Sequence, residues 1–214
     1  MKKIIIIGAG AMGSAFAVPC LENQNEVTLV GTHLEDDLIN NIKSNNNLHP
    51  ALNIELPLKL KVEKFEKLQS ILEEEVDIIV AGVSSVGIEW FVKQITKSYK
   101  KNLPIILLTK GLAIEGNELI TLSDKIKKLL KDEGHTQVNI SAIKGPCLAA
   151  GLAYKMRTGT VIANPDIKET EKLKKIISTD YYSTEVSDDL TGIELSGAIK
   201  NIYSMLIGAS EGLS

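Results

Sequence analysis

Two lysines stand where proton transfer or anion binding would need a cation. Lys200 lies in a stretch with helical periodicity, 189–209, on a face of small residues that would let a ligand or a neighbouring backbone approach. The pKa of a lysine falls readily on burial, so this side chain can act as an acid or a base near neutral pH. Lys110 follows an expected strand, 104–109, at the sheet edge where ligands bind in open α/β folds, which indicates a phosphate or cofactor contact. Alternatively, Lys200 lies at the helix edge and keeps its ammonium in water, and Lys110 is a solvated loop residue.

Three glycines near the N-terminus have the spacing of a phosphate-binding turn. They follow four consecutive isoleucines and precede a helical run, 14–21. Gly8 would make the tight turn, Gly10 would let a pyrophosphate approach the backbone, and Gly13 would let the helix pack closely on the strand. The free N–H groups and the positive dipole end of such a helix favour phosphates. The pattern predicts a dinucleotide site, against the alternative of a turn that binds nothing. The expected cofactor contacts are Gly8, Ala9, Gly10, Ala11, Met12 and Gly13.

The residues after the second expected strand, 26–31, bear on the choice of cofactor. NAD-specific sites usually place Asp or Glu at this strand end, where the carboxylate holds the ribose 2′-hydroxyl. This chain has Thr32 and His33 there, and its acids come later, from Glu35 onward. Without a carboxylate a 2′-phosphate is not repelled, so we expect NADP or NAD, with NADP slightly favoured. Thr32 and His33 are expected to contact the cofactor, or alternatively to form only a polar loop.

Strands and helices alternate along most of the chain. The pattern predicts an α/β fold with a Rossmann-type, doubly wound, mostly parallel sheet, followed by one long helix. Ser84, at the carboxyl end of another expected strand, is a further cofactor contact. Other expected elements are strands 76–83, 137–143, 160–163 and 182–186, a loop at 45–57 and helices 118–133 and 168–178.

Composition excludes several classes of function. The net charge of −3 provides no strong field for nucleic acid or an anionic membrane, and 4% aromatic residues argue against base-stacking platforms. Cys20 and Cys147 have neither metal-site spacing nor a disulfide framework, which favours a reduced, cytoplasmic setting and no metal. The isoleucine run is too short for a signal peptide core or a membrane span.

Four segments, taken in order, resemble one family: 8–13, 109–111, 145–149 and 192–201. They are similar to NAD(P)-dependent glycerol-3-phosphate dehydrogenases, and the His49-Pro50 loop and the Gly31-Thr32 strand end are nearest to the archaeal branch. The resemblance covers the whole chain. It implies a dinucleotide-binding domain at 1–187, and it implies that the long last helix is the first helix of an α-helical C-terminal domain, the substrate and catalytic domain, whose incomplete start is 188–214. It implies reduction of dihydroxyacetone phosphate to sn-glycerol 3-phosphate for glycerophospholipid synthesis, a small-molecule substrate, and a homodimer when complete.

The same resemblance implies roles for individual residues. Lys200 would exchange a proton with the reacting carbonyl group, because an ammonium there stabilises the negative charge that hydride delivery builds on oxygen. Cys147 replaces a hydroxyl residue common in the family, so its side chain would form only a weak hydrogen bond. The implied catalytic residues are Lys200 and Lys110, the implied substrate contacts are Lys110, Gly145, Cys147, Lys200 and Asn201, and the implied further cofactor contacts are Lys110 and Ala149.

One departure from the family pattern is large. Family members continue after the segment that holds Lys200 into a helical domain, which supplies an acidic residue and an Arg-Asn pair, whereas this sequence stops at Ser214. We therefore expect a fragment, a split gene or a decayed enzyme. Two other functions stay open: a related dehydrogenase of hydroxy or imino acids, against which the Gly145-Pro146-Cys147 turn argues, and a non-catalytic NADP-binding module.

Overall fold

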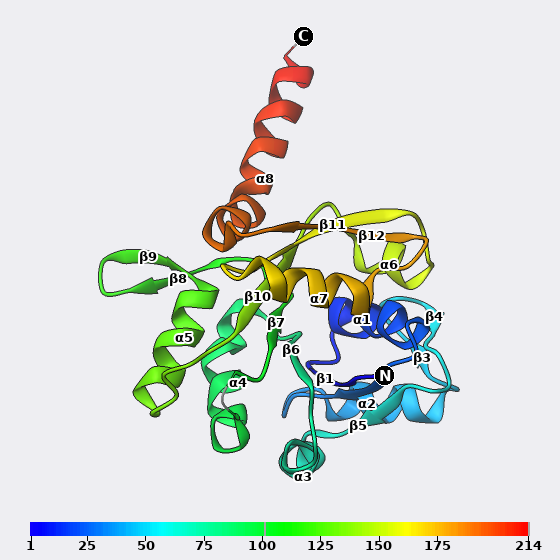
Figure 1. Cartoon of the computed structure of the whole chain (residues 1–214). Helices are drawn as coiled ribbons and strands as arrows, with labels where there is room; N and C mark the ends of the chain where they lie inside the picture. Colours follow the sequence, from blue (N-terminus) through cyan, green and yellow to red (C-terminus); the bar gives the residue numbers. More distant parts are fainter. Residues whose placement is uncertain (101, 214) are drawn as a thin grey trace.

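The computed structural model, which describes residues 1–100 and 102–213, is built around the isoleucine run, which forms strand β1, Lys3–Ile7 (Figure 1). Ile4 and Ile6 pack into a core cluster on one face of the sheet, and Ile5 and Ile7 pack into a second cluster on the other face. Successive side chains of a strand point to opposite faces, so an unbroken apolar run requires helices on both sides.

Eight strands form one sheet in the order β12-β11-β10-β7-β6-β1-β2-β5. Six of them are parallel, whereas β11 runs antiparallel to β10 and carries the parallel β12 beside it. The predicted mostly parallel, Rossmann-type sheet is therefore confirmed. The strands after β1 are β2 Glu26–Val30, β5 Lys61–Glu63, β6 Ile78–Ala81, β7 Ile105–Leu107, β10 Ile140–Lys144, β11 Thr158–Ala163 and β12 Tyr182–Ser187.

Helices cover both faces of this sheet. One face is covered by α1, Ala11–Glu22, α2, Asp36–Ser44, and α7, Ile167–Ile177, together with the short α6, Ala149–Ala153. The other face is covered by α3, Leu68–Glu73, α4, Ile88–Ile95, and α5, Leu122–Asp132. Single 3-10 turns adjoin α3 and α4, namely η1 Phe65–Lys67, η2 Ser85–Gly87 and η3 Thr96–Ser98.

Two local predictions were wrong. The helix expected at 118–133 begins only at Leu122, because Gly116 adopts a left-handed φ of +58° and turns the chain into a hairpin of β8, Leu112–Glu115, with β9, Glu118–Thr121. The Thr121 side chain then accepts a hydrogen bond from the N–H of Asp124 and caps α5 (3.1 Å). The loop expected at 45–57 contains a second small hairpin, β3 Leu48–His49 with β4 Ile54–Glu55.

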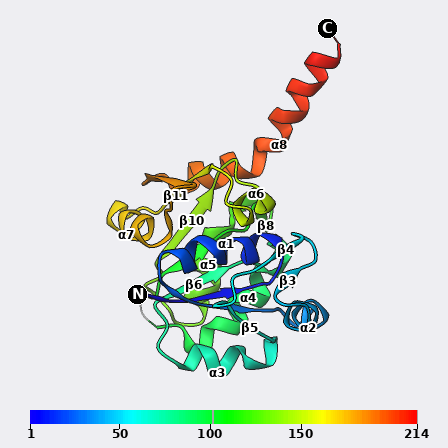
Figure 2. The ribbon, with the colours of Figure 1, turned by 90° about the vertical axis from the view of Figure 1, so that its right-hand side faces the viewer.

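The last helix, α8, Leu190–Gly212, begins on the sheet and then leaves it. In Figures 1 and 2 it extends away from the rest of the molecule. Its first turns contact β10 and β11, whereas residues 201–213 are all exposed. Apolar side chains on this part of the helix are thus exposed, among them Ile202 and Leu206 (54% and 55%). Within the described residues no helix, α8 included, has the length and apolarity needed to cross a bilayer.

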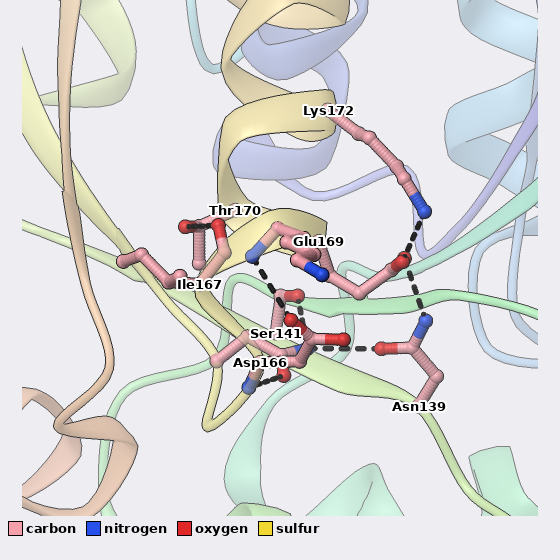
Figure 3. Close-up of polar contacts among 9 residues, drawn as sticks. Asn139, Ser141, Asp166, Ile167, Glu169, Thr170 and Lys172 are labelled. Atoms are coloured by element: carbon pink, nitrogen blue, oxygen red, sulfur yellow. Dashed lines mark hydrogen bonds and ion pairs between the residues drawn. The ribbon is translucent and has the colours of Figure 1, made fainter.

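A polar network fixes the chain where β11 returns toward α7 (Figure 3). The side-chain amide nitrogen of Asn164 lies within hydrogen-bond distance of the Ile140 carbonyl, Asn139 Oδ1 and Ser141 Oγ, at 2.9 to 3.0 Å. Asn139 in turn donates to Glu169 on α7 (2.9 Å). Because Ile140 is the first residue of β10, this network lies at the sheet edge opposite the carboxyl ends of the parallel strands.

Candidate functional site

The three glycines of the first turn differ in what surrounds them. Gly8 has a φ of +109°, and a Cβ built on it would stand 2.7 Å from the backbone of Gly82. A Cβ on Gly13 would overlap the carbonyl oxygen of Gly8. By contrast, the nearest heavy atom to a Cβ on Gly10 is Glu35 Oε1, at 3.9 Å. The fold itself therefore requires Gly8 and Gly13, whereas Gly10 borders space that a ligand could occupy.

The N-terminus of α1 faces the same space. Gly10 is the capping residue, no side chain caps the helix among the described residues, and its first turn holds no acidic residue. Such a terminus presents unpaired N–H groups and positive dipole charge to an anion. The expected contacts Ala11 and Met12 are half-buried in this first turn.

The turn is held from behind through Ala9, which is fully buried. Its carbonyl accepts hydrogen bonds from Ser14 Oγ (2.9 Å) and from Nε2 of the buried His49 (3.0 Å). The main-chain N–H of Leu52 donates to the other ring nitrogen of His49 (3.3 Å), so the proton of a neutral ring lies on Nε2. The small hairpin of β3 and β4 thereby supports the glycine turn.

A carboxylate does reach the end of β2, contrary to the reasoning from the sequence. Glu35 stands at the N-cap position of α2 but its side chain makes no hydrogen bond to that helix; its Oε2 instead accepts hydrogen bonds from the main-chain N–H groups of Ala9 (3.0 Å) and Thr32 (2.7 Å). The strand end itself carries no acid, but the turn at 32–35 folds the side chain back over it. The expected contact Thr32 is half-buried beside this carboxylate, whereas the ring of His33 packs on Trp90 and Phe65, with centroids 5.1 and 6.1 Å away.

The neighbouring strands also deliver polar groups to this edge. Ser84 is exposed after β6 and begins the turn η2. Thr109, after β7, donates its hydroxyl proton to the Val83 carbonyl (2.7 Å), which joins the two strand ends. Lys110 follows and is exposed at the edge. The expectation that Ser84 and Lys110 lie at the carboxyl edge of the sheet agrees with the structure.

The turn after β10 brings the next group of expected residues to α1. A Cβ on Gly145 would stand 2.8 Å from Thr160 Cα, so this position has no room for a side chain. Burial raises the pKa of the Cys147 thiol, which donates a long hydrogen bond to the Leu148 carbonyl (3.9 Å). Ala149 starts α6, which packs against α1.

Lys110 and Lys200, distant in sequence, line one pocket of about 270 Å³ between the sheet edge and α8. Lys110 also lines a hollow of about 20 Å³, which continues toward Met12 and Cys147. Asn201, the residue after Lys200, is exposed and is not among the pocket-lining residues. The full lining of the larger pocket is Lys110, Lys144, Gly145, Pro146, Val161, Ile193, Ser196, Gly197 and Lys200.

One lining residue, Lys144, received no role from the sequence. It ends β10, only 4% of its surface is exposed, and its Nζ donates to the carbonyls of Leu107 (3.1 Å) and Thr109 (2.7 Å). Burial lowers the pKa of Lys144 to about 8, although the carboxylate of Glu194 opposes the shift. A lysine at the end of a buried strand, directly before Gly145, is the sequence signal that could have drawn attention to it.

Lys144 and Glu194 together seat the helix that carries Lys200. Glu194 is fully buried and accepts a hydrogen bond from the N–H of Ser123, in the first turn of α5 (3.2 Å). A Cβ on Gly197 would lie 3.2 Å from Lys144 Cδ, so the small residue lets α8 approach the sheet. Of the small-residue face predicted for this helix, Gly197 meets the sheet, whereas Ser204 and Gly208 are exposed.

Comparison with known proteins gives one consistent result. The family model described as the N-terminus of NAD-dependent glycerol-3-phosphate dehydrogenase matches residues 3–170. The NADP(+)-dependent glycerol-3-phosphate dehydrogenase of Archaeoglobus fulgidus is 35% identical over 206 residues, which are 95% of this chain and 59% of that protein. The glycerol-3-phosphate dehydrogenase [NAD(P)+] of Mesoplasma florum is 33% identical, again over 95% of this chain and 59% of the relative.

Solved structures agree. The crystal structure of glycerol-3-phosphate dehydrogenase from Coxiella burnetii has a TM-score of 0.83 and 26% identity, covering 99% of this chain and 62% of that one. This chain therefore spans about three fifths of the length of the proteins that it matches.

Proposed function

The chain belongs to the NAD-dependent glycerol-3-phosphate dehydrogenase family, and we propose that it serves the reduction of dihydroxyacetone phosphate to sn-glycerol 3-phosphate with NAD(P)H, a step toward glycerophospholipids. The observation that carries the proposal is the convergence of Lys110 and Lys200 on one pocket, together with the second, small hollow through which Lys110 is connected to Met12 in the first turn of α1. Two cations at the carboxyl edge of a Rossmann-type sheet suit a phosphorylated carbonyl substrate.

The dinucleotide would lie along the first turn and the strand ends next to it. The open space beside Gly10 and the uncapped N-terminus of α1 fit a pyrophosphate. Thr32 and His33 would flank the adenosine end, and Ser84, Lys110 and Ala149 the nicotinamide side. When bound, the reduced cofactor supplies the hydride, and the protein supplies position and electrostatics. The relatives are named for NADP(+) or NAD(P)+, so either cofactor is consistent with the family.

The substrate would occupy the pocket of about 270 Å³. We assign Lys200 to the carbonyl oxygen, where its ammonium stabilises the developing negative charge and gives a proton. Lys110 would contact both substrate and cofactor, and Gly145 and Cys147 would line the substrate side. Asn201 lies outside the pocket lining, so it would contact the substrate only if α8 changed its position relative to the sheet.

The domain division and the assembly belong to the same proposal. We place the nucleotide-binding domain at 1–187 and the start of the substrate and catalytic domain at 188–214. The exposed apolar side chains of α8 support the proposal that further helices pack against this helix in the complete enzyme. We also propose that the complete enzyme is a homodimer. We further propose that the complete enzyme is cytoplasmic and has no nucleic-acid partner.

The test combines binding and turnover. Fluorescence titration measures NADH and NADPH binding to the 214-residue chain, and absorbance at 340 nm follows their oxidation with dihydroxyacetone phosphate. Because the chain spans 59% of the A. fulgidus relative, the same assays use a chimera that adds the remaining part of that relative. We expect low turnover from the chain and rapid turnover from the chimera, because a phosphate dianion needs more charge-assisted partners than the pocket lysines supply.

A substrate panel and one substitution sharpen this test. Lys200→Met in the chimera should abolish turnover and leave cofactor affinity unchanged within about twofold. Near-normal turnover by that variant would refute the role of Lys200. Oxidation of NADH or NADPH with a keto acid or an imino acid as substrate, but not with dihydroxyacetone phosphate, would favour a related dehydrogenase instead. Cofactor binding without turnover in every form would leave a nucleotide-binding module.

A further inference from the structure

We propose that His49 is a positioning residue for the dinucleotide: its ring fixes the peptide group between Ala9 and Gly10 so that the N–H of Gly10 is available to the pyrophosphate. The inference rests on the proposed dinucleotide site at the glycine turn, and it assigns a determinant of cofactor affinity on a segment outside that turn. It starts from one buried hydrogen bond, between Nε2 of His49 and the carbonyl oxygen of Ala9 (3.0 Å).

The peptide group between Ala9 and Gly10 has its carbonyl oxygen held from behind the turn. Ala9 is fully buried, and its carbonyl accepts from His49 and from Ser14 Oγ (2.9 Å). This peptide is trans, and in a trans peptide the C=O and N–H groups point in opposite directions. A carbonyl that points toward His49 therefore directs the N–H of Gly10 away from the β3–β4 hairpin.

The N–H of Gly10 is the first one of the turn that is left for a ligand. The N–H of Gly8 donates to the Val30 carbonyl (2.8 Å), and that of Ala9 donates to Glu35 Oε2 (3.0 Å). In the described part of the chain no backbone carbonyl accepts from the N–H of Gly10. Because Gly10 directly precedes α1, its N–H adds to the N-terminal donors and the dipole that favour a phosphate.

Rotation of this peptide group would reverse its effect on an anion. Gly10 is half-buried, and the nearest heavy atom to a Cβ built on it is Glu35 Oε1, at 3.9 Å, so a ligand has room beside the turn. With the observed orientation a phosphate there meets an N–H donor. With the peptide rotated it would meet the negative end of a carbonyl dipole. The hydrogen bond from His49 opposes that rotation, because it would leave the buried donor without a partner.

The hairpin that carries His49 is itself anchored. Leu52 is buried in the core cluster that also holds Ala9. The hydroxyl of Tyr154 donates to the Asn53 carbonyl (2.9 Å), which joins the hairpin to the C-terminal end of α6. The N–H of Leu52 donates to Nδ1 of His49 (3.3 Å), so the neutral ring presents its proton to Ala9 from Nε2. The donor is therefore in place before any cofactor binds.

Two substitutions of His49 separate the hydrogen bond to the turn from the stability of the hairpin. Glutamine can place its amide nitrogen near the position of Nε2, so His49→Gln retains a donor to Ala9. Asparagine is shorter and can place its carbonyl oxygen near the position of Nδ1, so His49→Asn retains an acceptor for Leu52 and loses the donor to Ala9. His135→Asn is the matched control, because Nε2 of His135 is also 3.0 Å from a backbone carbonyl, that of Thr96.

The measurement is the dissociation constant of NADH, obtained by fluorescence titration of the 214-residue chain, together with urea unfolding of each protein. If the turn adopts other orientations, the apparent affinity falls with the fraction of molecules that stays competent to bind. We expect His49→Asn to weaken NADH binding about fivefold to tenfold, the scale of one hydrogen bond, and His49→Gln to weaken it less than about twofold. His135→Asn should lose stability and keep the NADH affinity of wild type.

Ser14→Ala tests the same carbonyl from within α1. It removes the second donor to Ala9 and leaves the hairpin unchanged, so it decides the question if His49→Asn does not fold. We expect NADH binding to weaken about threefold or more, again the scale of one hydrogen bond.

The outcomes separate the inference from the function on which it rests. Wild-type affinity in a folded His49→Asn protein, or in Ser14→Ala if that protein does not fold, overturns the role of His49 while the dinucleotide site stands. Equal losses in His49→Gln and His49→Asn also overturn it, because the donor to Ala9 would then make no difference. A loss of NADH affinity in His135→Asn as large as in His49→Asn overturns it as well, since general destabilisation would explain both. Failure of wild-type protein to bind NADH removes the site and the inference together.

Discussion

Substituting Gly10 by alanine should separate cofactor binding from folding. Gly10 has φ −60° and ψ 169°, an extended conformation that alanine adopts without strain. The nearest heavy atom to the added Cβ is 3.9 Å away, an ordinary contact distance. The unfolded chain loses conformational entropy on Gly→Ala, so the free energy of unfolding should stay level or rise by about 0.4–1 kcal/mol.

The effect on the ligand should be large. The missing side chain at this position is what lets a pyrophosphate approach the backbone, so a methyl group would stand in the path of the phosphates. We expect the affinity for NADH to fall tenfold or more, which corresponds to about 1.4 kcal/mol of binding free energy. Fluorescence titration gives the affinity, and urea unfolding followed by circular dichroism gives the stability of the same protein. Gly10→Val should lower the affinity further.

Gly13→Ala is the opposing control within the same turn. Its Cβ would overlap the carbonyl oxygen of Gly8, so the helix must move away from the strand, and overpacking of this kind costs about 1–3 kcal/mol of stability. A folded Gly10→Ala protein that binds NADH as tightly as wild type would refute the placement of the cofactor on this turn. Destabilisation of Gly10→Ala as large as that of Gly13→Ala would refute the structural distinction between the two glycines.

Two further predictions concern stability away from the cofactor turn. Burial lowers the pKa of Lys144 to about 8, below the value of about 10.4 for an unfolded lysine, so above about pH 8 the folded state loses a proton that the unfolded state keeps. The free energy of unfolding should therefore gain about 2 kcal/mol from this group between about pH 8 and pH 10, a gain absent in Lys144→Met. Urea unfolding of both proteins across that range measures the difference, and parallel pH profiles would contradict it. Asn164→Ala should lower the free energy of unfolding by about 1–3 kcal/mol, because it leaves buried partners on β10 without their hydrogen bonds. The exposed Asn40→Ala should change stability by less than about 0.5 kcal/mol, and an equal effect in both would refute the role of the network.

Local patterns in the sequence were sufficient for the features that depend on neighbours along the chain. The isoleucine run specified a strand buried on both faces, and the spacing of Gly8, Gly10 and Gly13 specified the turn into α1. Among the small residues around Lys200, Gly197 indicated where α8 approaches the sheet. These features follow from periodicity and from steric requirements that one glycine imposes on its own backbone.

Tertiary structure decided the features that depend on distant segments. The sequence shows that Glu35 lies beyond the end of β2, but only the fold shows that its carboxylate returns to the N–H of Ala9. The sequence likewise shows a lysine before Gly145, but it does not show that this lysine is buried. Lys144 is buried, and its pKa is lowered, because α8 covers its side chain while the end of β7 supplies the two carbonyls that accept from its Nζ. Hydrogen bonding and desolvation depend on which groups surround an atom in space, and segments far apart in the chain supply those groups.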